Sequence, residues 1–117
     1  MTKIFIRNLK VRTLIGVGDK ERQSNQDVVV NLEIGYDASR AIRSDSIKNA
    51  VDYQALSDDI IGRAAQTRFY LIEKLANFIL DVVMENALVQ EAKILIDKPR
   101  ALKSAESVAV ELFRKRP

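Results

Sequence analysis

Hydrophobic and polar residues alternate with the period of a β-strand in four stretches of this 117-residue chain. The four stretches are residues 4–15, 26–36, 92–98 and 108–113. Between the second and third stretches, apolar residues recur every three or four positions over residues 53–64 and 71–84, which is the spacing of amphipathic helices. This order, β-β-α-α-β-β, predicts an α+β fold in which a four-stranded antiparallel sheet carries both helices on one face.

Details of the helices and connections follow from the same pattern. Asp52 is expected to cap the first helix, because its carboxylate can accept hydrogen bonds from the first free backbone amides. Residues 18–25 are polar and predict a loop between the first two strands, and residues 37–49 predict a polar connection with one short helical turn. The buried stripe of the first helix is predicted to be Leu56, Ile60, Ile61 and Ala64, and that of the second Leu71, Ile72, Leu75, Phe78, Ile79, Val82 and Val83.

Lys98 occupies an unusual position in the third strand. It continues the apolar face formed by Ala92, Ile94 and Ile96, and Pro99 then ends the strand because it has no N–H for a sheet ladder. Two interpretations fit such a lysine. It is either a partly desolvated amine that transfers protons, or a long stem that covers apolar surface while its head reaches water.

Three further polar residues are candidates for a catalytic or binding role, and each also has a purely structural interpretation. Glu21 lies in the middle of the loop between the first two strands, where a glutamate is ordinarily solvated. Tyr53 starts the first helix, where an aromatic side chain often packs at the edge of the core. Glu73 lies in the first turn of the second helix, where a carboxylate interacts favourably with the helix dipole. For each of these three residues, the pattern of hydrophobic and polar positions leaves both a functional and a structural role open.

Composition excludes several classes of chemistry. The chain has no cysteine and no histidine, so thiolate nucleophiles, disulfides, imidazole bases and zinc sites built on these residues are excluded. Any proton transfer must use lysine, tyrosine, aspartate or glutamate. The formal net charge of +3 is mild, and only 6% of residues are aromatic, so a base-stacking surface for nucleic acid is not expected.

Length and hydropathy predict a single domain without a membrane span. A chain of 117 residues is expected to fold as one domain over residues 1–117. No stretch approaches the roughly 18 uninterrupted apolar residues of a membrane span, and the N-terminal residues lack the pattern of a signal peptide. We therefore expect a cytoplasmic protein that contacts neither membrane nor nucleic acid.

Five short motifs, spaced over nearly the whole chain, carry a resemblance. They are Ile15-Gly16-Val17, Glu21 followed five residues later by Gln26, Val51-Asp52-Tyr53, Phe69 with Leu71-Ile72-Glu73, and Asp97-Lys98-Pro99. Together they resemble the dihydroneopterin aldolase family. The resemblance implies the tunnelling fold, in which β-β-α-α-β-β units join edge to edge into a β-barrel. It also implies a homo-oligomer, either tetramer or octamer, with pterin sites between adjacent subunits.

The same resemblance implies roles for individual residues. Glu73 would hold the pterin by accepting hydrogen bonds from the ring N–H and the 2-amino group, and its neighbour Ile72 receives no role of its own. Lys98 would transfer a proton from the substrate hydroxyl through a water molecule. Tyr53 would deliver or remove a proton with another water, and Glu21 would complete the site near Lys98. No cofactor and no metal are expected, since the C=N bond of a dihydropterin can itself accept the electrons.

Three segments resemble one branch of the family more than the others. Residues 25–28, 96–102 and 105–108 are similar to members that epimerise dihydroneopterin triphosphate at C2′. Epimerisation is therefore the predicted reaction. Aldol cleavage to glycolaldehyde and 6-hydroxymethyl-7,8-dihydropterin is the alternative, and a pterin-binding scaffold without turnover is a third possibility. Cations that could hold a triphosphate, or could equally be solvated surface charges, are Arg22, Arg68, Arg100 and Lys103.

Overall fold

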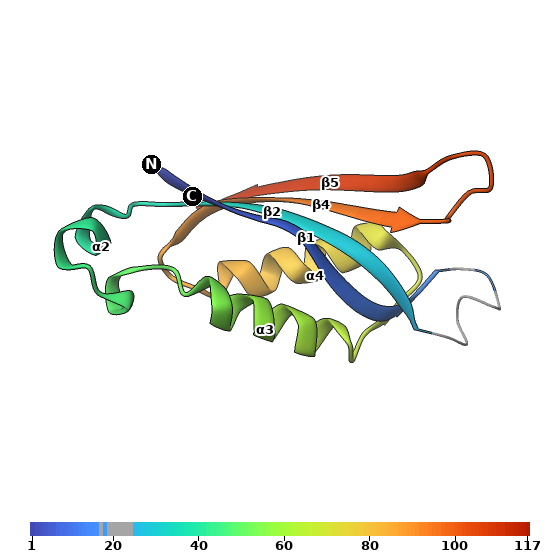
Figure 1. Ribbon diagram of the computed structural model, residues 1–117, viewed down its shortest axis with the longest axis horizontal. Coiled ribbons are helices and arrows are strands. Elements are labelled where there is room, and N and C mark those ends of the chain that lie inside the picture. Colours follow the sequence, from blue (N-terminus) through green and yellow to red (C-terminus); the bar gives the residue numbers. More distant parts are fainter. Residues whose placement is uncertain (17, 19–24) are drawn as a thin grey trace.

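The computed structural model describes residues 1–16, 18 and 25–117. Within these residues, four long antiparallel strands form one sheet, and two helices cover one of its faces (Figure 1). The strand order is β3-β1-β2-β4-β5. The elements are β1 (Thr2–Ile15), β2 (Gln26–Tyr36), α2 (Ser39–Ser44), η1 (Ile47–Asn49), α3 (Tyr53–Ala64), β3 (Arg68–Phe69), α4 (Ile72–Met84), β4 (Val89–Pro99) and β5 (Ser107–Lys115).

The predicted order of four long strands and two long helices is confirmed, with one addition. Residues 68–69 form a short strand, β3, which pairs in parallel with Leu14 and Ile15 at the end of β1. The sheet therefore has five strands rather than four. A two-residue strand has no periodicity for a sequence pattern to reveal, because its pairing depends on where α3 ends and the chain turns back.

Local signals account well for the helix starts and connections. The Asp52 carboxylate accepts a hydrogen bond of 3.0 Å from the Ala55 amide and caps α3, as predicted. The polar connection after β2 contains the α-helix α2 and the single 3-10 turn η1, which is slightly more helix than expected. Ser46 caps η1 by accepting from the Lys48 amide.

A β-bulge in β1 keeps its apolar residues on one face. The register with β2 shifts between Ile6 and Leu9, and Asn8 has a positive φ of 56°. The Asn8 amide donates to Oδ1 of Asn31 at 2.9 Å, which replaces a ladder bond lost at the bulge. The extra residue changes the parity of the strand. Ile6 and Leu9 therefore both pack against the core, although a regular strand would place them on opposite faces.

The core lies between the sheet and the helices, and most of the predicted stripe is confirmed. Leu56, Ile60 and Ala64 of α3 are buried, as are most apolar residues of α4. Two predicted core residues are wrong. Ile61 is 39% exposed because it lies at the edge of the apolar stripe of α3. Leu71 is 53% exposed, because it precedes α4 in an extended conformation and so leaves the buried face of the helix.

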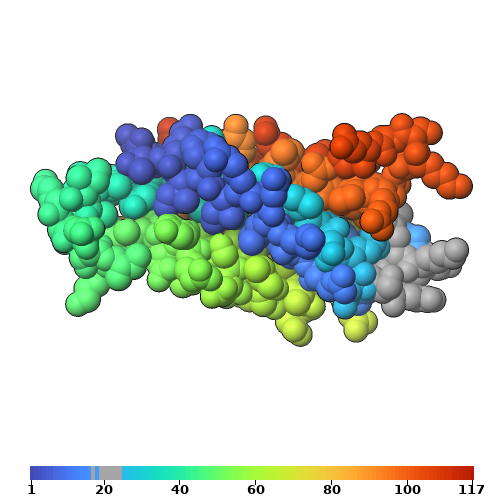
Figure 2. All heavy atoms as spheres, in the orientation of Figure 1, coloured from blue at the N-terminus to red at the C-terminus, as the bar shows by residue number. Residues whose placement is uncertain are grey.

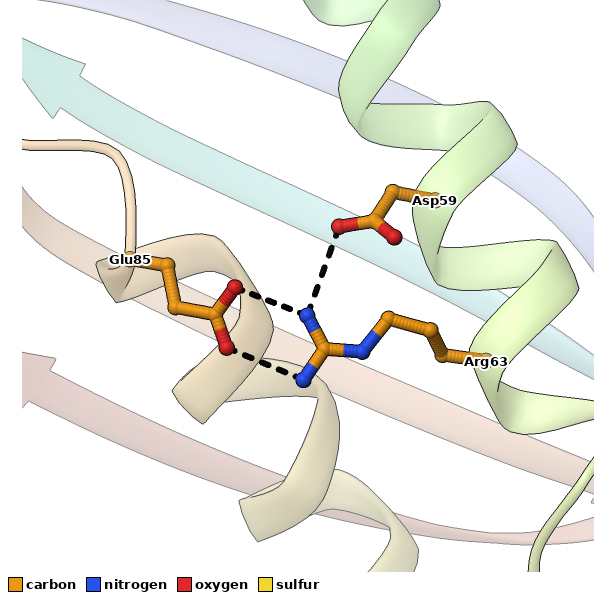
Figure 3. Close-up of polar contacts among 3 residues, drawn as sticks. All are labelled: Asp59, Arg63 and Glu85. Carbon is orange, nitrogen blue, oxygen red and sulfur yellow. Dashed lines mark hydrogen bonds and ion pairs between the residues drawn. The ribbon is translucent and has the colours of Figure 1, made fainter.

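Three arginines hold the C-terminal end of α4. Arg63 of α3 donates to both carboxylate oxygens of Glu85 at 2.7 and 2.9 Å and also reaches Asp59 (Figure 3). Arg114 of β5 donates to Asp81 and Asn77 on α4. The Arg116 guanidinium donates to the backbone carbonyls of Met84, Asn86 and Val89. The bond from Arg116 to Met84 satisfies one of the carbonyls that a helix leaves free at its C-terminal end, and the other two arginines bind side chains of α4 or the residue after it. None of the helices within the described part of the chain has the length and hydropathy to cross a membrane.

Candidate active site

Lys98 points into the core, as the strand pattern predicted. It is only 8% exposed and follows the buried residues Ala92, Ile94 and Ile96 along the same face of β4. Its neighbour across the sheet is Val108 of β5. Burying most of a lysine side chain costs hydration of the ammonium group, so the surroundings must compensate for it. This requirement favours polar partners for the ammonium group near the end of the strand.

Lys98 and Glu73 both line a pocket at this end of the strand, and most of its other lining residues are apolar. It has a volume of about 180 Å³ and opens between the first turn of α4, the end of β4 and the start of β5. In Figure 1, α4 begins and the arrow of β4 ends toward the right-hand side of the molecule. The residues that line it are Gly16, Tyr70, Leu71, Ile72, Glu73, Lys98, Ala101 and Val108. The fold thus brings together a carboxylate and an amine that are 25 positions apart in the sequence.

Glu73 is positioned by the way α4 begins. Leu71 occupies the N-cap position in an extended conformation, and its side chain makes no capping hydrogen bond. Glu73 is therefore the acidic residue of the first turn, where the helix dipole stabilises its charge. Its side chain is exposed toward the pocket, whereas Ile72 beside it is almost fully buried and anchors the helix in the core. The carboxylate is consequently free to accept hydrogen bonds from a ligand.

Gly16 shapes the wall of the pocket at the end of β1. Its φ of 125° lies in a region that side chains rarely adopt, so glycine is needed where the strand ends. The Gly16 amide donates to the Phe69 carbonyl at 3.3 Å, and the Gln26 side chain donates to the Ile15 carbonyl at 3.0 Å. These bonds tie the ends of β1 and β2 to the segment that carries Tyr70 and leads into α4.

Tyr53 does not reach this pocket within one chain. It is 60% exposed at the first residue of α3, whereas the pocket lies beyond the other end of that helix. A helix of 12 residues is about 18 Å long, too far for a tyrosine side chain to span. Figure 1 shows α3 and α4 running in opposite directions, so their first residues lie at opposite ends of the helical layer. Glu21 and Arg22 lie outside the described residues.

Sequence reasoning missed Tyr70 and Ala101 as lining residues. Tyr70 is 61% exposed and precedes α4, in a segment where the pattern showed only an interruption between helices. Ala101 follows the strand that carries Lys98. Neither had a signal of its own, because an exposed tyrosine and an alanine in a turn are ordinary. The available indication was that Tyr70 lies three positions before Glu73, and Ala101 three positions after Lys98, in the sequence.

Comparison with known proteins gives a consistent result. The sequence model of the FolB dihydroneopterin aldolase family matches residues 4–113. The chain belongs to the dihydroneopterin aldolase family. A dihydroneopterin triphosphate 2′-epimerase of Pseudomonas aeruginosa is 40% identical over 96% of this chain and 91% of the relative. A dihydroneopterin aldolase of Haemophilus influenzae is 33% identical over 97% of both chains.

Solved structures of the dihydroneopterin aldolase family have the same fold. A FolB protein of Vibrio cholerae superposes with a TM-score of 0.93 at 36% identity, covering 99% of this chain and 98% of that one. The Escherichia coli dihydroneopterin aldolase, solved with neopterin, superposes with a TM-score of 0.91 at 28% identity, covering 97% and 99%. The predicted α+β fold and the family resemblance are therefore confirmed.

Proposed function

We propose that this protein is a pterin enzyme that inverts C2′ in the side chain of dihydroneopterin triphosphate. The observation that carries the proposal is the convergence of Glu73 and buried Lys98 on one pocket. A carboxylate at the mouth suits the donor edge of a pterin, and an amine beside it suits proton transfer to a side-chain hydroxyl. The similarity to an enzyme named as a 2′-epimerase, at 40% identity over nearly the full chain, supports this choice of reaction.

The chemistry needs only acid and base groups. Removal of the proton from the 2′-hydroxyl lets the C1′–C2′ bond break, and its electron pair moves into the C=N bond of the dihydropterin. The ring nitrogen of that bond takes up a proton from water, and the products of this step are an enamine and an aldehyde whose carbonyl carbon was C2′. If the aldehyde turns its other face to the enamine before the bond forms again, C2′ is inverted. Lys98 holds the transferred proton through a water molecule, and Glu73 keeps the pterin in place while the fragment rotates.

Tyr53 belongs to this site only if a second copy supplies it. The proposal therefore includes a cytoplasmic homo-oligomer, tetramer or octamer, whose sites lie between subunits. The sheet supports assembly, because β5 has a partner on one side only among the described strands, and most of β1 lacks a partner beyond β2. Long unpaired edges are aggregation-prone unless another chain covers them. Light scattering that shows a stable monomer at micromolar concentration would contradict the assembly.

A mixing experiment tests the shared site directly. Tyr53→Ala and Lys98→Ala chains are each expected to be nearly inactive alone. Co-assembly of equal amounts would restore about a quarter of the sites, since half of the pockets carry Lys98 and half of the neighbours carry Tyr53. Activity that does not rise on mixing would mean that Tyr53 acts within its own chain or has no role.

Product analysis tests the reaction. The enzyme would be incubated separately with dihydroneopterin and with its triphosphate, and the products separated by chromatography. Inverted triphosphate as the main product supports the epimerase. Rapid formation of 6-hydroxymethyl-7,8-dihydropterin from the unphosphorylated substrate, with little inversion of the triphosphate, would instead establish the aldolase, which the family match and the 33% identical relative favour. A scaffold without turnover would give neither product, although burial of Lys98 has no evident purpose in a scaffold.

A further inference from the structure

A pair of threonine hydroxyls ties β1 to the chain that leads into α4. Thr13 has no exposed surface and lies on the same face of β1 as the buried residues Val11 and Ile15. Its Oγ1 lies 3.0 Å from Oγ1 of Thr67, in the turn between α3 and β3. A buried hydroxyl lowers stability unless it is hydrogen-bonded, so this contact satisfies Thr13. The bond joins two residues that are 54 positions apart in the sequence.

The direction of this bond follows from the other contacts of Thr67. The Thr67 hydroxyl donates its hydrogen to the carbonyl of Ala64, the last residue of α3, at 2.7 Å. Its oxygen therefore accepts from Thr13, because a hydroxyl carries a single hydrogen. The Thr67 amide donates to the same Ala64 carbonyl at 3.0 Å. Thr67 thus closes the C-terminal end of α3 and offers its oxygen to β1.

Thr67 starts the segment that leads into the wall of the pocket. Residues 68–69 pair with the end of β1, and residues 70–73 line the pocket. The Phe69 ring also packs against the Phe78 ring of α4, with the two centroids 5.7 Å apart. In Figure 2, yellow-green atoms of the chain between α3 and α4 lie beneath the blue end of β1. The point where this segment crosses β1 therefore helps to set where α4 begins.

The two charged residues of the pocket belong to different layers of the fold. Lys98 lies on β4 in the sheet, whereas Glu73 lies on α4 in the helical layer. Their separation depends on how the start of α4 is held against the sheet. The bond from Thr13 holds Thr67, which is six positions before Glu73, although neither threonine lines the pocket. It fixes the start of α4 from outside the site.

We propose that Thr13 is a positioning residue for pterin binding, which acts through Thr67 to hold Glu73 in place relative to Lys98. The inference rests on the proposed function and adds to it a residue that does not touch the substrate. A pterin contacts both charged residues only while the start of α4 keeps its place on the sheet, so loss of the hydroxyl bond weakens binding. The hydroxyl carries this role, since valine has nearly the same shape but cannot donate.

Titration of neopterin into the wild type and into Thr13→Val measures the effect. Valine leaves the bond from Thr67 to Ala64 in place and creates no unpaired donor, so the variant is expected to fold. Neopterin should bind about two- to tenfold more weakly, which corresponds to the net energy of one hydrogen bond. Thr13→Ser keeps the hydroxyl and should restore most of the affinity. Ile60→Val, a buried substitution in α3, is the control and should bind neopterin as the wild type does.

A double-mutant cycle separates positioning from a general loss of stability. In the Glu73→Gln background the carboxylate that Thr13 positions is already absent, so adding Thr13→Val should cost no further affinity. A substitution that only loosened the fold would weaken binding by the same factor in both backgrounds. Equal losses in the two backgrounds, or equal neopterin affinity in Thr13→Val and the wild type, would overturn the positioning role and leave the proposed function intact. Failure of the wild type to bind neopterin would overturn both.

Discussion

The two ends of α4 differ in how their backbone groups are satisfied. At the C-terminal end, Arg116 donates to the carbonyl of Met84, the last residue of α4, and Arg63 and Arg114 bind the side chains of Glu85 and Asp81. At the N-terminal end, Leu71 provides no side-chain cap, and the first turn opens onto the pocket with Glu73. One end is closed by the protein's own side chains, whereas the other opens onto the pocket, where we propose that the pterin binds. The difference indicates that stability and binding are assigned to opposite ends of one helix.

Lys98→Met, in the pocket onto which the first turn of α4 opens, is expected to have the largest effect on activity. Methionine keeps the apolar stem in the core but cannot transfer a proton, so kcat is expected to fall about a hundredfold or more. Steady-state kinetics with the triphosphate substrate measure the effect. Thermal unfolding of the variant checks that it is folded. A kcat close to that of the wild type would show that Lys98 is structural.

Glu73→Gln, in the first turn of α4, replaces one carboxylate oxygen, a hydrogen-bond acceptor, with an NH2 donor. The amide would face the donor edge of the pterin with a donor of its own. An unsatisfied buried group costs about 1–3 kcal/mol, so neopterin should bind about five- to more than a hundredfold more weakly. Glu85→Gln is the matched control at the closed end and should leave neopterin affinity unchanged. Equal affinity in the wild type and Glu73→Gln would remove Glu73 from the binding site.

Arg116→Ala tests the C-terminal end of α4. The variant leaves the carbonyls of Met84 and Asn86 without their charged donor, which should lower the free energy of unfolding by about 1.5 kcal/mol. Urea denaturation measures this loss, and Arg40→Ala on exposed α2 is the control. Neopterin affinity should not change. Weaker binding in Arg116→Ala at full folding would mean that the two ends of α4 are coupled.

Arg63→Gln should lower the Tm by the smallest amount, and this decrease should depend on pH. Arg63 lowers the pKa of Glu85 below its ordinary value of 4.5, so the pair contributes stability above that pH and loses it as the carboxylate becomes protonated. Because the pair is exposed, the decrease in Tm should be small and less than that of Arg116→Ala. Thermal unfolding should show a difference from the wild type at pH 7 that disappears in strong acid. A constant difference across this range would exclude the ion pair as its cause.

The candidate site was partly predictable because two of its residues follow local rules. Strand alternation alone pointed Lys98 inward, and helix-start signals placed Glu73 in a first turn. Tyr70 could not be ranked in the same way, since an exposed tyrosine looks the same in the sequence with or without a ligand. Whether Tyr53 contributes depends on a second chain, which no pattern within one chain can position.

Local periodicity by itself determined the long elements of this protein. Strand β2 spans Gln26–Tyr36, the range that its alternation predicted, and Asp52 caps α3 as its position indicated. These features depend on neighbours a few residues apart, so the sequence specifies them directly.

Only the tertiary structure decided how the elements meet. The bulge at Asn8, the pairing of β3 with β1 and the exposure of Leu71 all depend on contacts between distant segments. The same holds for the pocket, since Glu73 and Lys98 share it only because α4 packs across the end of β4 and β5. Packing of a helix on a sheet fixes such distances through many weak contacts, and no short stretch of sequence encodes them.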